Sequence, residues 1–365
     1  MKWRYKRELA RLISERNMQS EQVIRSDFFF NGGFMKIVVD LQERSYPIYI
    51  EKGILKSVNQ YVNLQRKVLI VTDSGVPSVY SECVQMQCKE ATIVCIEQGE
   101  SSKNIENYQA LIQKMLELEF SRKDLMIAVG GGVVGDLCGF VASTYMRGID
   151  FINIPTTTLA QVDSSIGGKT AIDLGNVKNC IGSFYQPKAV FIDPKTLDTL
   201  SNRHFYSGLV EALKSGAIYD QELFELLEDC DVKEQIEEIL YRSLMVKKAV
   251  VEIDEKELGL RKILNFGHTL GHGIESASNY ELLHGEAVSL GMVKMVEDEN
   301  VRKRLVRVLE KWNMPLEYEY DKQKSFEYML HDKKKVANMV SVVQVKEIGQ
   351  ACIIDMTQEE LKVKF

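Results

Sequence analysis

Short apolar runs alternate with a helical segment between residues 67 and 158, and this alternation restricts the fold more than any other feature of the sequence. The apolar runs are 67–75, 91–97, 124–132 and 151–158, and residues 104–120 place apolar side chains on one helical face. An apolar run that ends in a polar turn is typical of a strand buried on both faces of a parallel sheet. We therefore predict a doubly wound, Rossmann-like α/β domain that binds ligands at the carboxyl ends of its strands.

The pattern changes after about Thr199, where the sequence becomes mainly helical. Helices are predicted over 205–217, 221–228, 233–251, 270–278 and 285–301, and strand-like alternation returns only at 341–345 and 351–355. A chain of 365 residues suggests two domains. We expect an α/β domain over 35–198 and a mainly α-helical domain over 199–365. Residues 1–34 are expected to lie outside the fold, with a regulatory or assembly extension as the alternative.

The composition of the chain limits which binding partners and which cellular compartment we expect. The net charge of −6 argues against nucleic acid or an anionic membrane as the main partner. No stretch approaches the ~18 apolar residues of a membrane span, and the N-terminus lacks the apolar run of a secretory signal. The seven cysteines are scattered without a CxxC motif, which is typical of a reducing, cytoplasmic environment.

A glycine-rich turn follows the third apolar run. Gly130, Gly132 and Gly135 fit G-x-G-x-x-G, with Asp136 next, between a predicted strand and a predicted helix. Such a turn lets backbone N–H groups approach a pyrophosphate. However, the dinucleotide fingerprint usually follows the first strand, and no acidic residue lies ~20 positions further on to hold a ribose. A close strand–helix packing contact, with Asp136 as the helix cap, is the alternative.

Three of the five histidines, His268, His272 and His284, fall within 17 residues. Two histidines and one carboxylate around an open position form a catalytic zinc site. Residues four apart share a helix face, so spacing favours His268 and His272 as the ligand pair. Spacing does not decide which glutamate supplies the carboxylate ligand, and Glu211, Glu275 and Glu286 are all candidates.

Several cationic residues lie in glycine-flanked turns or in the helical half. They are Arg147, Lys169, Lys178, Lys214, Lys247, Arg261 and the run 333–335. Cations gathered around a metal indicate an anionic substrate such as a phosphate or a carboxylate.

Four stretches, in order along the chain, resemble the 3-dehydroquinate synthase family. They are residues 130–187, GLVEALKSGAI (208–218), RKILNFGHTLGHGIE (261–275) and LHGEAVSLGM (283–292). The resemblance implies an NAD-binding N-terminal domain, a helical C-terminal domain that holds zinc or cobalt, and a homodimer. It also implies conversion of 3-deoxy-D-arabino-heptulosonate 7-phosphate to 3-dehydroquinate and phosphate in the shikimate pathway. The implied steps are transient oxidation by NAD, phosphate β-elimination, reduction, ring opening and an intramolecular aldol reaction.

The resemblance also implies a role for individual residues, and it changes the ligand pair that spacing favours. The implied metal ligands are Glu211, His268 and His284, and the residues for proton transfer or positioning are His272, Lys214, Asp163 and Asn265. The implied substrate contacts are Arg147 (from the neighbouring subunit), Lys169, Asn179, Lys247, Arg261 and one lysine of the 333–335 run, for which we take Lys334. The implied cofactor contacts are Asp73, Glu100, Lys103, Gly132, Asp136, Thr156, Thr157, Lys178, Thr196 and Thr199.

The sequence departs from the family at one motif. Residues 201–204 read Ser-Asn-Arg-His where the family usually shows Pro-x-Arg-Glu, so His204 replaces an acid on the cofactor side. The alternatives are another sugar-phosphate cyclase of the 2-deoxy-scyllo-inosose synthase type, a metal-dependent polyol dehydrogenase, and an inactive binding protein. Lys247, Arg261 and Asn265 match the dehydroquinate pattern, so we favour the 3-dehydroquinate synthase family over these alternatives.

Overall fold

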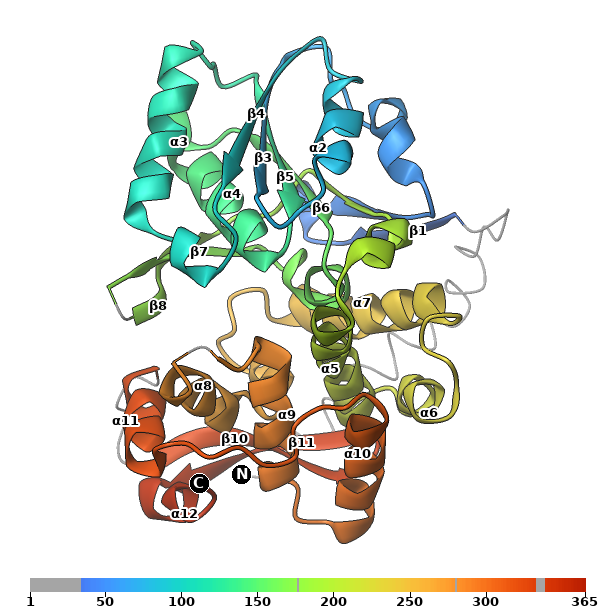
Figure 1. Cartoon of the computed structure of the whole chain (residues 1–365), viewed down its shortest axis with the longest axis vertical. Coiled ribbons are helices and arrows are strands. Elements are labelled where there is room, and N and C mark those ends of the chain that lie inside the picture. Colours follow the sequence, from blue (N-terminus) through green and yellow to red (C-terminus); the bar gives the residue numbers. More distant parts are fainter. Residues whose placement is uncertain (1–33, 176, 280, 333–338) are drawn as a thin grey trace. The chain divides into compact units, whose positions relative to one another are not determined.

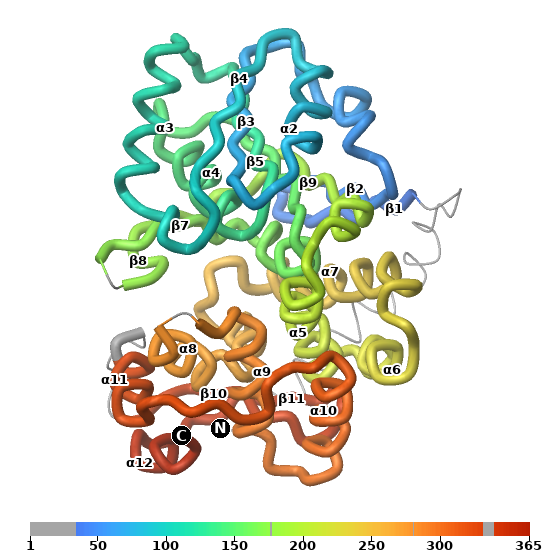
Figure 2. The backbone as a smooth tube through the Cα atoms, viewed as in Figure 1, coloured from blue at the N-terminus to red at the C-terminus, as the bar shows by residue number. Residues whose placement is uncertain are grey.

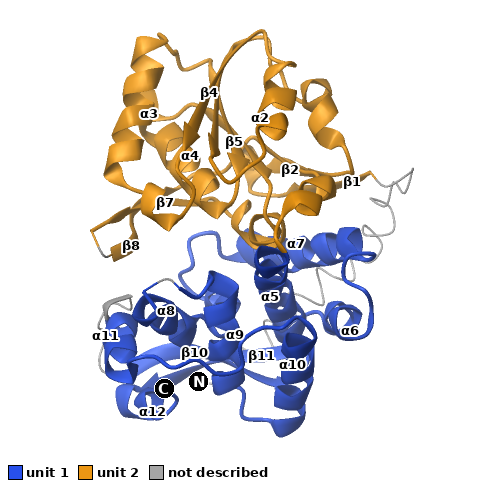
Figure 3. Cartoon of the chain, viewed as in Figure 1, with its two compact units in different colours: residues 1–25, 202–365 blue, residues 26–201 orange. Residues whose placement is uncertain are grey.

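The computed structural model describes residues 34–175, 177–279, 281–332 and 339–365 (Figure 1). These residues fall into two compact units that meet in sequence between Ser201 and Asn202, whereas the sequence placed the boundary after residue 198 (Figure 3). The predicted N-terminal extension lies outside the described residues, except for Phe34, whose ring stacks on Tyr49 and Tyr61. No helix in the described part of the chain is long and apolar enough to cross a lipid bilayer.

The unit over 34–201 is built on a seven-stranded sheet in the order β1-β2-β9-β6-β5-β3-β4. All neighbouring strands are parallel except the antiparallel β1–β2 pair. The strands are β1 (Met35–Val39), β2 (Tyr46–Ile50), β3 (Lys67–Asp73), β4 (Glu90–Ile96), β5 (Leu125–Gly130), β6 (Asp150–Pro155) and β9 (Ala189–Ile192). The predicted α/β fold with a parallel sheet is therefore confirmed.

Helices cover both faces of this sheet. On β3, Val68 and Ile70 face a core shared with η2 (Ile54–Gln60) and α2 (Ser78–Gln85). Leu69 and Val71 face the opposite core, shared with α3 (Ile105–Glu117) and α4 (Gly132–Thr144). Each fully buried side chain of this kind contributes roughly 1.5–3 kcal/mol. Burial on both faces explains why the strands read as continuous apolar runs.

The strand order reverses between β3 and β5, because β4 lies on the outer side of β3. In open parallel sheets, ligands bind outside the carboxyl ends of the strands at such a point. The glycine-rich turn follows β5, so it lies at this position even though it belongs to a later strand. The remaining elements of this unit are η1 (Gln42–Arg44), η3 (Glu100–Ser102), η4 (Tyr145–Arg147), the π-helix η5 (Ala160–Ser164), the antiparallel hairpin β7 (Lys169–Leu174) and β8 (Val177–Phe184), and η6 (Pro194–Thr199).

The unit over 202–365 is mainly helical, with one antiparallel hairpin near its end. Its elements are α5 (Asn202–Ile218), α6 (Gln221–Asp229), α7 (Ile236–Ile253), η7 (Leu260–Asn265), α8 (His268–Ala277), α9 (His284–Met295), α10 (Glu299–Lys311), α11 (Lys322–Asp332), β10 (Met339–Glu347), β11 (Gln350–Thr357) and α12 (Gln358–Lys362). The predicted helix over 285–301 is wrong, because the chain breaks there into α9 and α10. Val296 is extended, and the Asp298 carboxylate caps α10 by accepting from the N–H groups of Asn300 and Val301.

Glycines allow α5, α8 and α9 to approach one another closely. Gly267 caps α8 with φ +78°, and a Cβ there would lie 2.8 Å from the Val288 carbonyl oxygen of α9. A Cβ on Gly285 would lie 1.8 Å from the Ser207 carbonyl oxygen of α5. Only glycine fits at such distances. The first residue of α9, His284, is thereby held beside α5, and α8 packs along α9 (Figure 2).

Candidate active site

The Glu211 carboxylate of α5 lies between two histidines from the starts of α8 and α9. Its Oε1 atom is 3.5 Å from Nε2 of His268 and 3.5 Å from Nε2 of His284. Glu211 is 1% exposed, and Oε1 makes no hydrogen bond. Ligand nitrogens of His268, His272 and His284 all lie within 4.8 Å of one another. A buried carboxylate oxygen facing two imidazole nitrogens is a donor set suited to a divalent transition metal.

The buried charges of this cluster shift one another's titration. Burial would raise the pKa of Glu211, but Lys214 and the two histidines hold it well below its usual value. Burial lowers the pKa of His268 to about 3, against the attraction of Glu211. Burial would also lower the pKa of His284, but the attraction of the Glu211 and Glu275 carboxylates on either side of the ring raises it to about 10. A metal that binds His284 at neutral pH must therefore displace a proton.

The other ring nitrogen of each histidine has its own acceptor. Nδ1 of His268 lies 3.1 Å from the Phe266 carbonyl oxygen, and Nδ1 of His284 lies 3.3 Å from Glu275 Oε2. Both acceptors require a proton on Nδ1, which leaves the Nε2 lone pairs toward Glu211 in the neutral rings. This arrangement fits the donor set of a metal site.

The three carboxylates that sequence spacing could not distinguish have different partners in the structure. Glu286 accepts hydrogen bonds from Nε and Nη2 of Arg203 at 2.7 Å, and it caps α9 by accepting from the Leu283 N–H. Glu275 contacts the far side of the His284 ring. Glu211 alone faces the Nε2 atoms of two histidines. His272 lies in the same cluster, its ring centroid 5.3 Å from that of His268.

Three predicted cationic site residues that the structure describes in this unit are buried. Lys214, on α5, pairs with Glu211, while Lys247, on α7, is 7% exposed and Arg261, in η7, is 2% exposed. Asn265, also in η7, donates to Glu257. The elements α5, α7 and η7 pack on one another. Lys334 lies outside the described residues.

Most predicted cofactor residues of the other unit follow the carboxyl ends of parallel strands. They are Asp73 at the end of β3, Glu100 and Lys103 after β4, Gly132 after β5, Thr156 and Thr157 after β6, and Thr196 and Thr199 after β9, with Lys178 on β8. The structure contradicts Asp136 as the helix cap, because Gly131 occupies that position and Asp136 lies within α4. A Cβ on Gly132 would lie only 3.1 Å from Ser164 Oγ, so the start of α4 packs closely against η5.

A network of charges lies beside the glycine-rich turn. Lys103 Nζ is 2.8 Å from Glu100 and 3.3 Å from Asp136, and Lys178 Nζ is 3.8 Å from Glu100. Burial would lower the pKa of Lys103, but Asp136 and Glu100 outweigh burial and raise it. Lys103 is therefore held as a buried cation at the carboxyl edge of the sheet.

Gln161 was missed by the sequence reasoning, because a lone glutamine gives no signal. Its buried amide donates to the carbonyl oxygens of Pro155 and Asp193 at 3.1 Å and to the Thr196 hydroxyl at 2.9 Å. These contacts tie the turn after β6 to the turn after β9. Gln161 therefore fixes the backbone that carries the predicted threonine contacts.

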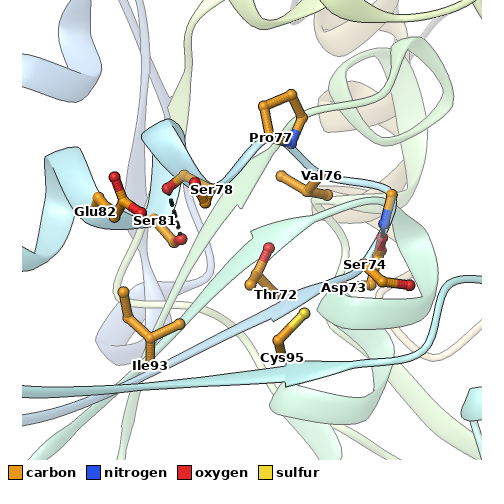
Figure 4. A pocket seen from close by; sticks show the side chains of 11 residues that line it. Thr72, Asp73, Ser74, Val76, Pro77, Ser78, Ser81, Glu82, Ile93 and Cys95 are labelled. Carbon is orange, nitrogen blue, oxygen red and sulfur yellow. Dashed lines mark hydrogen bonds between the residues drawn. The ribbon is translucent and has the colours of Figure 1, made fainter.

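A pocket of 520 Å³ opens beside the end of β3 (Figure 4). It is lined by Thr72, Asp73, Ser74, Gly75, Val76, Pro77, Ser78, Ser81, Glu82, Ile93 and Cys95. Burial raises the pKa of Asp73, although its carboxylate accepts hydrogen bonds from the N–H groups of Gly75 and Val76. The size of the pocket is suited to one part of a nucleotide-like ligand.

The remaining predicted residues of this unit lie around the β7–β8 hairpin and in the turns before it. Asp163 lies in η5, Lys169 begins β7, Asn179 lies on β8, and Arg147 is exposed in η4 with φ +69°. At the sequence departure, His204 is exposed in the first turn of α5.

Two family models match adjacent parts of the chain. Residues 93–207 match the N-terminal domain of 3-dehydroquinate synthase, and residues 208–335 match its C-terminal domain. A 3-dehydroquinate synthase of Clostridium beijerinckii is 42% identical over 350 residues, which cover 90% of this chain and 99% of that protein. One of Enterococcus faecalis is 40% identical over 349 residues, covering 90% and 98%.

Solved structures of sugar-phosphate cyclases share the fold. A 2-deoxy-scyllo-inosose synthase complexed with carbaglucose-6-phosphate, NAD+ and Co2+ is 25% identical with a TM-score of 0.82, covering 90% of this chain and 98% of that one. A 2-epi-5-epi-valiolone synthase from Streptomyces hygroscopicus, with NAD+ and Zn2+ bound, is 27% identical with a TM-score of 0.79 at the same coverage. An iron-containing alcohol dehydrogenase, at 15% identity and a TM-score of 0.62, shares the fold alone.

The Arg203–Glu286 pair is expected to stabilise the start of α9. Replacing Arg203→Ala leaves the buried Glu286 carboxylate without its bidentate donor. We expect a loss of about 1–2 kcal/mol, because the guanidinium is 55% exposed. Urea unfolding measures it, with Lys303→Ala as the control, because Lys303 pairs with Glu299 at a site where both side chains are over 70% exposed. Equal unfolding midpoints for the two variants would contradict this reading.

Proposed function

Because the chain belongs to the 3-dehydroquinate synthase family, we propose that this enzyme converts 3-deoxy-D-arabino-heptulosonate 7-phosphate to 3-dehydroquinate and phosphate. The observation that carries the proposal is the buried Glu211 carboxylate facing His268 and His284 in a chain that matches the family over 93–335. The reaction is a carbon–oxygen lyase step, and we propose that it depends on NAD and on zinc or cobalt. The scattered free cysteines fit our further expectation that the enzyme works in the cytoplasm.

We take Glu211, His268 and His284 as the metal ligands. The unbonded Glu211 Oε1 and the two Nε2 atoms 3.5 Å from it supply three donors, and Nδ1 acceptors fix the orientation of both rings. Three protein ligands leave a position open for a substrate oxygen, as in catalytic zinc sites. When bound, the metal supplies Lewis acidity, and NAD supplies a reversible hydride acceptor.

The carboxyl edge of the parallel sheet would hold the dinucleotide. Gly131 and Gly132 begin α4 without side chains, so the N–H groups of its first turn are accessible to a pyrophosphate. The pocket beside Asp73, and the turns after β6 and β9 that Gln161 joins, would hold the two ends of the cofactor. We also take Lys103, Lys178 and Asp136 as cofactor contacts, because their network of charges lies beside the glycine-rich turn.

The cationic residues would bind and orient the anionic substrate. Lys247 and Arg261 are buried on packed elements of the unit that carries the metal ligands. Lys169 and Asn179 belong to the β7–β8 hairpin. His272, one helical turn from His268, would transfer protons, and Lys214, Asp163 and Asn265 would position the reacting groups.

Two alternatives have some support from the fold but less from the sequence. A 2-deoxy-scyllo-inosose synthase shares the architecture, but at 25% identity against 42% for a 3-dehydroquinate synthase. The dehydrogenase alternative rests on the fold alone, since the iron-containing alcohol dehydrogenase is only 15% identical. Neither matches this chain as the dehydroquinate family does.

The first test measures phosphate release. With NAD and zinc or cobalt, the protein should release phosphate from the heptulosonate phosphate without net accumulation of NADH, because the hydride returns to the substrate. Glu211→Gln should lower the rate to below about one hundredth, since a metal ligand is lost. Glu228→Gln is the control, because Glu228 is similarly buried but pairs with Arg304.

Other outcomes would point to the alternatives. Phosphate release from glucose 6-phosphate instead would indicate another sugar-phosphate cyclase. Net NADH formation from a polyol would indicate a dehydrogenase.

We also propose a homodimer in which Arg147 reaches the site of the neighbouring subunit. Arg147 is exposed in η4, and its neighbour Met146 is 40% exposed. Leu174, Val177 and Phe184 of the β7–β8 hairpin are 53%, 57% and 41% exposed. Exposed apolar side chains of this kind are typical of surfaces that contact another copy.

Mixing two inactive variants tests this arrangement. A mixed dimer of Arg147→Ala and Glu211→Gln subunits holds one site with both residues intact if Arg147 acts across the interface. Random exchange of subunits should then restore about a quarter of the parent activity. If Arg147 acts within its own subunit, every site in the mixture lacks one residue, and no activity returns.

A further inference from the structure

A buried glutamate from α8 contacts the ring of His284 on the side away from Glu211. Glu275 is 8% exposed, and its Oε2 atom lies 3.3 Å from His284 Nδ1. Glu275 lies seven residues after His268 on α8, whereas His284 begins α9. One side chain thus links the two helices that carry the candidate metal-binding histidines.

The backbone of His284 is fixed without Glu275. Gly285 packs against the Ser207 carbonyl of α5, and Glu286 is bound by Arg203 and by the Leu283 N–H. These contacts set where α9 begins, but they leave the rotation of the His284 ring free. Among the described residues, Glu275 is the one whose contact acts on the ring at Nδ1.

A carboxylate at this distance selects one form of the neutral ring. It only accepts hydrogen bonds, so Nδ1 must carry the proton and Nε2 must carry the lone pair. The hydrogen bond also makes the ring a stronger donor to a metal. His268 has a backbone carbonyl in the same place, the oxygen of Phe266 at 3.1 Å. The two histidines are therefore oriented by different groups, one of which is a charged side chain.

We propose that Glu275 is a positioning residue that holds the His284 ring with Nε2 toward Glu211 and so sets the affinity for the divalent metal. The inference rests on the proposed function, because it presupposes a metal held by Glu211, His268 and His284. Glu275 touches neither substrate nor cofactor in this account and acts through His284. Spacing had left it as a candidate ligand, and the geometry gives it this different role.

Metal affinity, measured without substrate, tests the proposal. Zinc and cobalt binding to the full-length protein is titrated against a chromophoric chelator, and the visible spectrum of the cobalt form is recorded. Glu275→Gln keeps an acceptor but loses the charge, and Glu275→Ala loses both. We expect affinity to fall by about 10–100-fold in these variants, more in Glu275→Ala, with a changed cobalt spectrum.

The control is Glu228→Gln, which removes the charge of a similarly buried glutamate paired with Arg304 and Arg307 outside the site. It should bind metal as the parent does. If Glu275→Ala does not fold, Glu275→Gln decides the question. Unchanged affinity and spectrum in Glu275→Gln, or an equal loss in Glu228→Gln, would overturn the proposal. A parent protein that binds no metal would overturn the proposed function itself, and this inference with it.

Discussion

The unit over 202–365 depends on one buried carboxylate, that of Glu211. A charge that is 1% exposed is costly unless neighbouring groups compensate for it, by several kcal/mol per ion. Here Lys214 lies on one side and two imidazoles lie on the other. Much of the local architecture follows from that requirement. Glycines at 267 and 285 let three helices approach closely enough for side chains from each to surround a single carboxylate.

The candidate cofactor site in the unit over 34–201 differs from the Glu211 cluster, because it is made largely of backbone groups. Parallel strands end at one edge of the sheet, and the turns after β5 and β6 carry glycines or threonines. Gln161 joins the turns after β6 and β9, and Lys103 pairs with Asp136 of α4. Such an edge suits a ligand bound along its length, as a dinucleotide is, whereas the Glu211 cluster suits one ion.

Local features of this protein could be predicted from the sequence, because local patterns encode them. The strands β3, β5 and β6 were predicted because burial on both faces makes them continuous apolar runs, and α3 because one face is apolar. The edge strand β4 was predicted from its apolar run, although most of its side chains are only partly buried. The break between α9 and α10 was not predicted, since no proline or glycine lies in residues 295–299 and only the Asp298 cap marks it. The β7–β8 hairpin was missed although Gly175-Asn176, a dipeptide typical of two-residue hairpin turns, lies between its strands, because neither strand is a continuous apolar run.

Contacts between helices could not be predicted in this way. Spacing favoured His268 and His272 because residues four apart share a helix face, but a metal site is defined by what faces it from other helices. The family resemblance supplied Glu211 and His284, and the structure then separated Glu275 and Glu286 by their partners. Nothing in the sequence relates Arg203 to Glu286, which lie 83 positions apart.

The most direct test of this account is a crystal structure of the zinc-loaded protein with anomalous scattering measured at the zinc edge. We predict a single strong peak about 2 Å from a Glu211 carboxylate oxygen and from the Nε2 atoms of His268 and His284, with His272 outside the coordination sphere. A peak bound by His268, His272 and His284, with Glu211 still paired to Lys214, would contradict it.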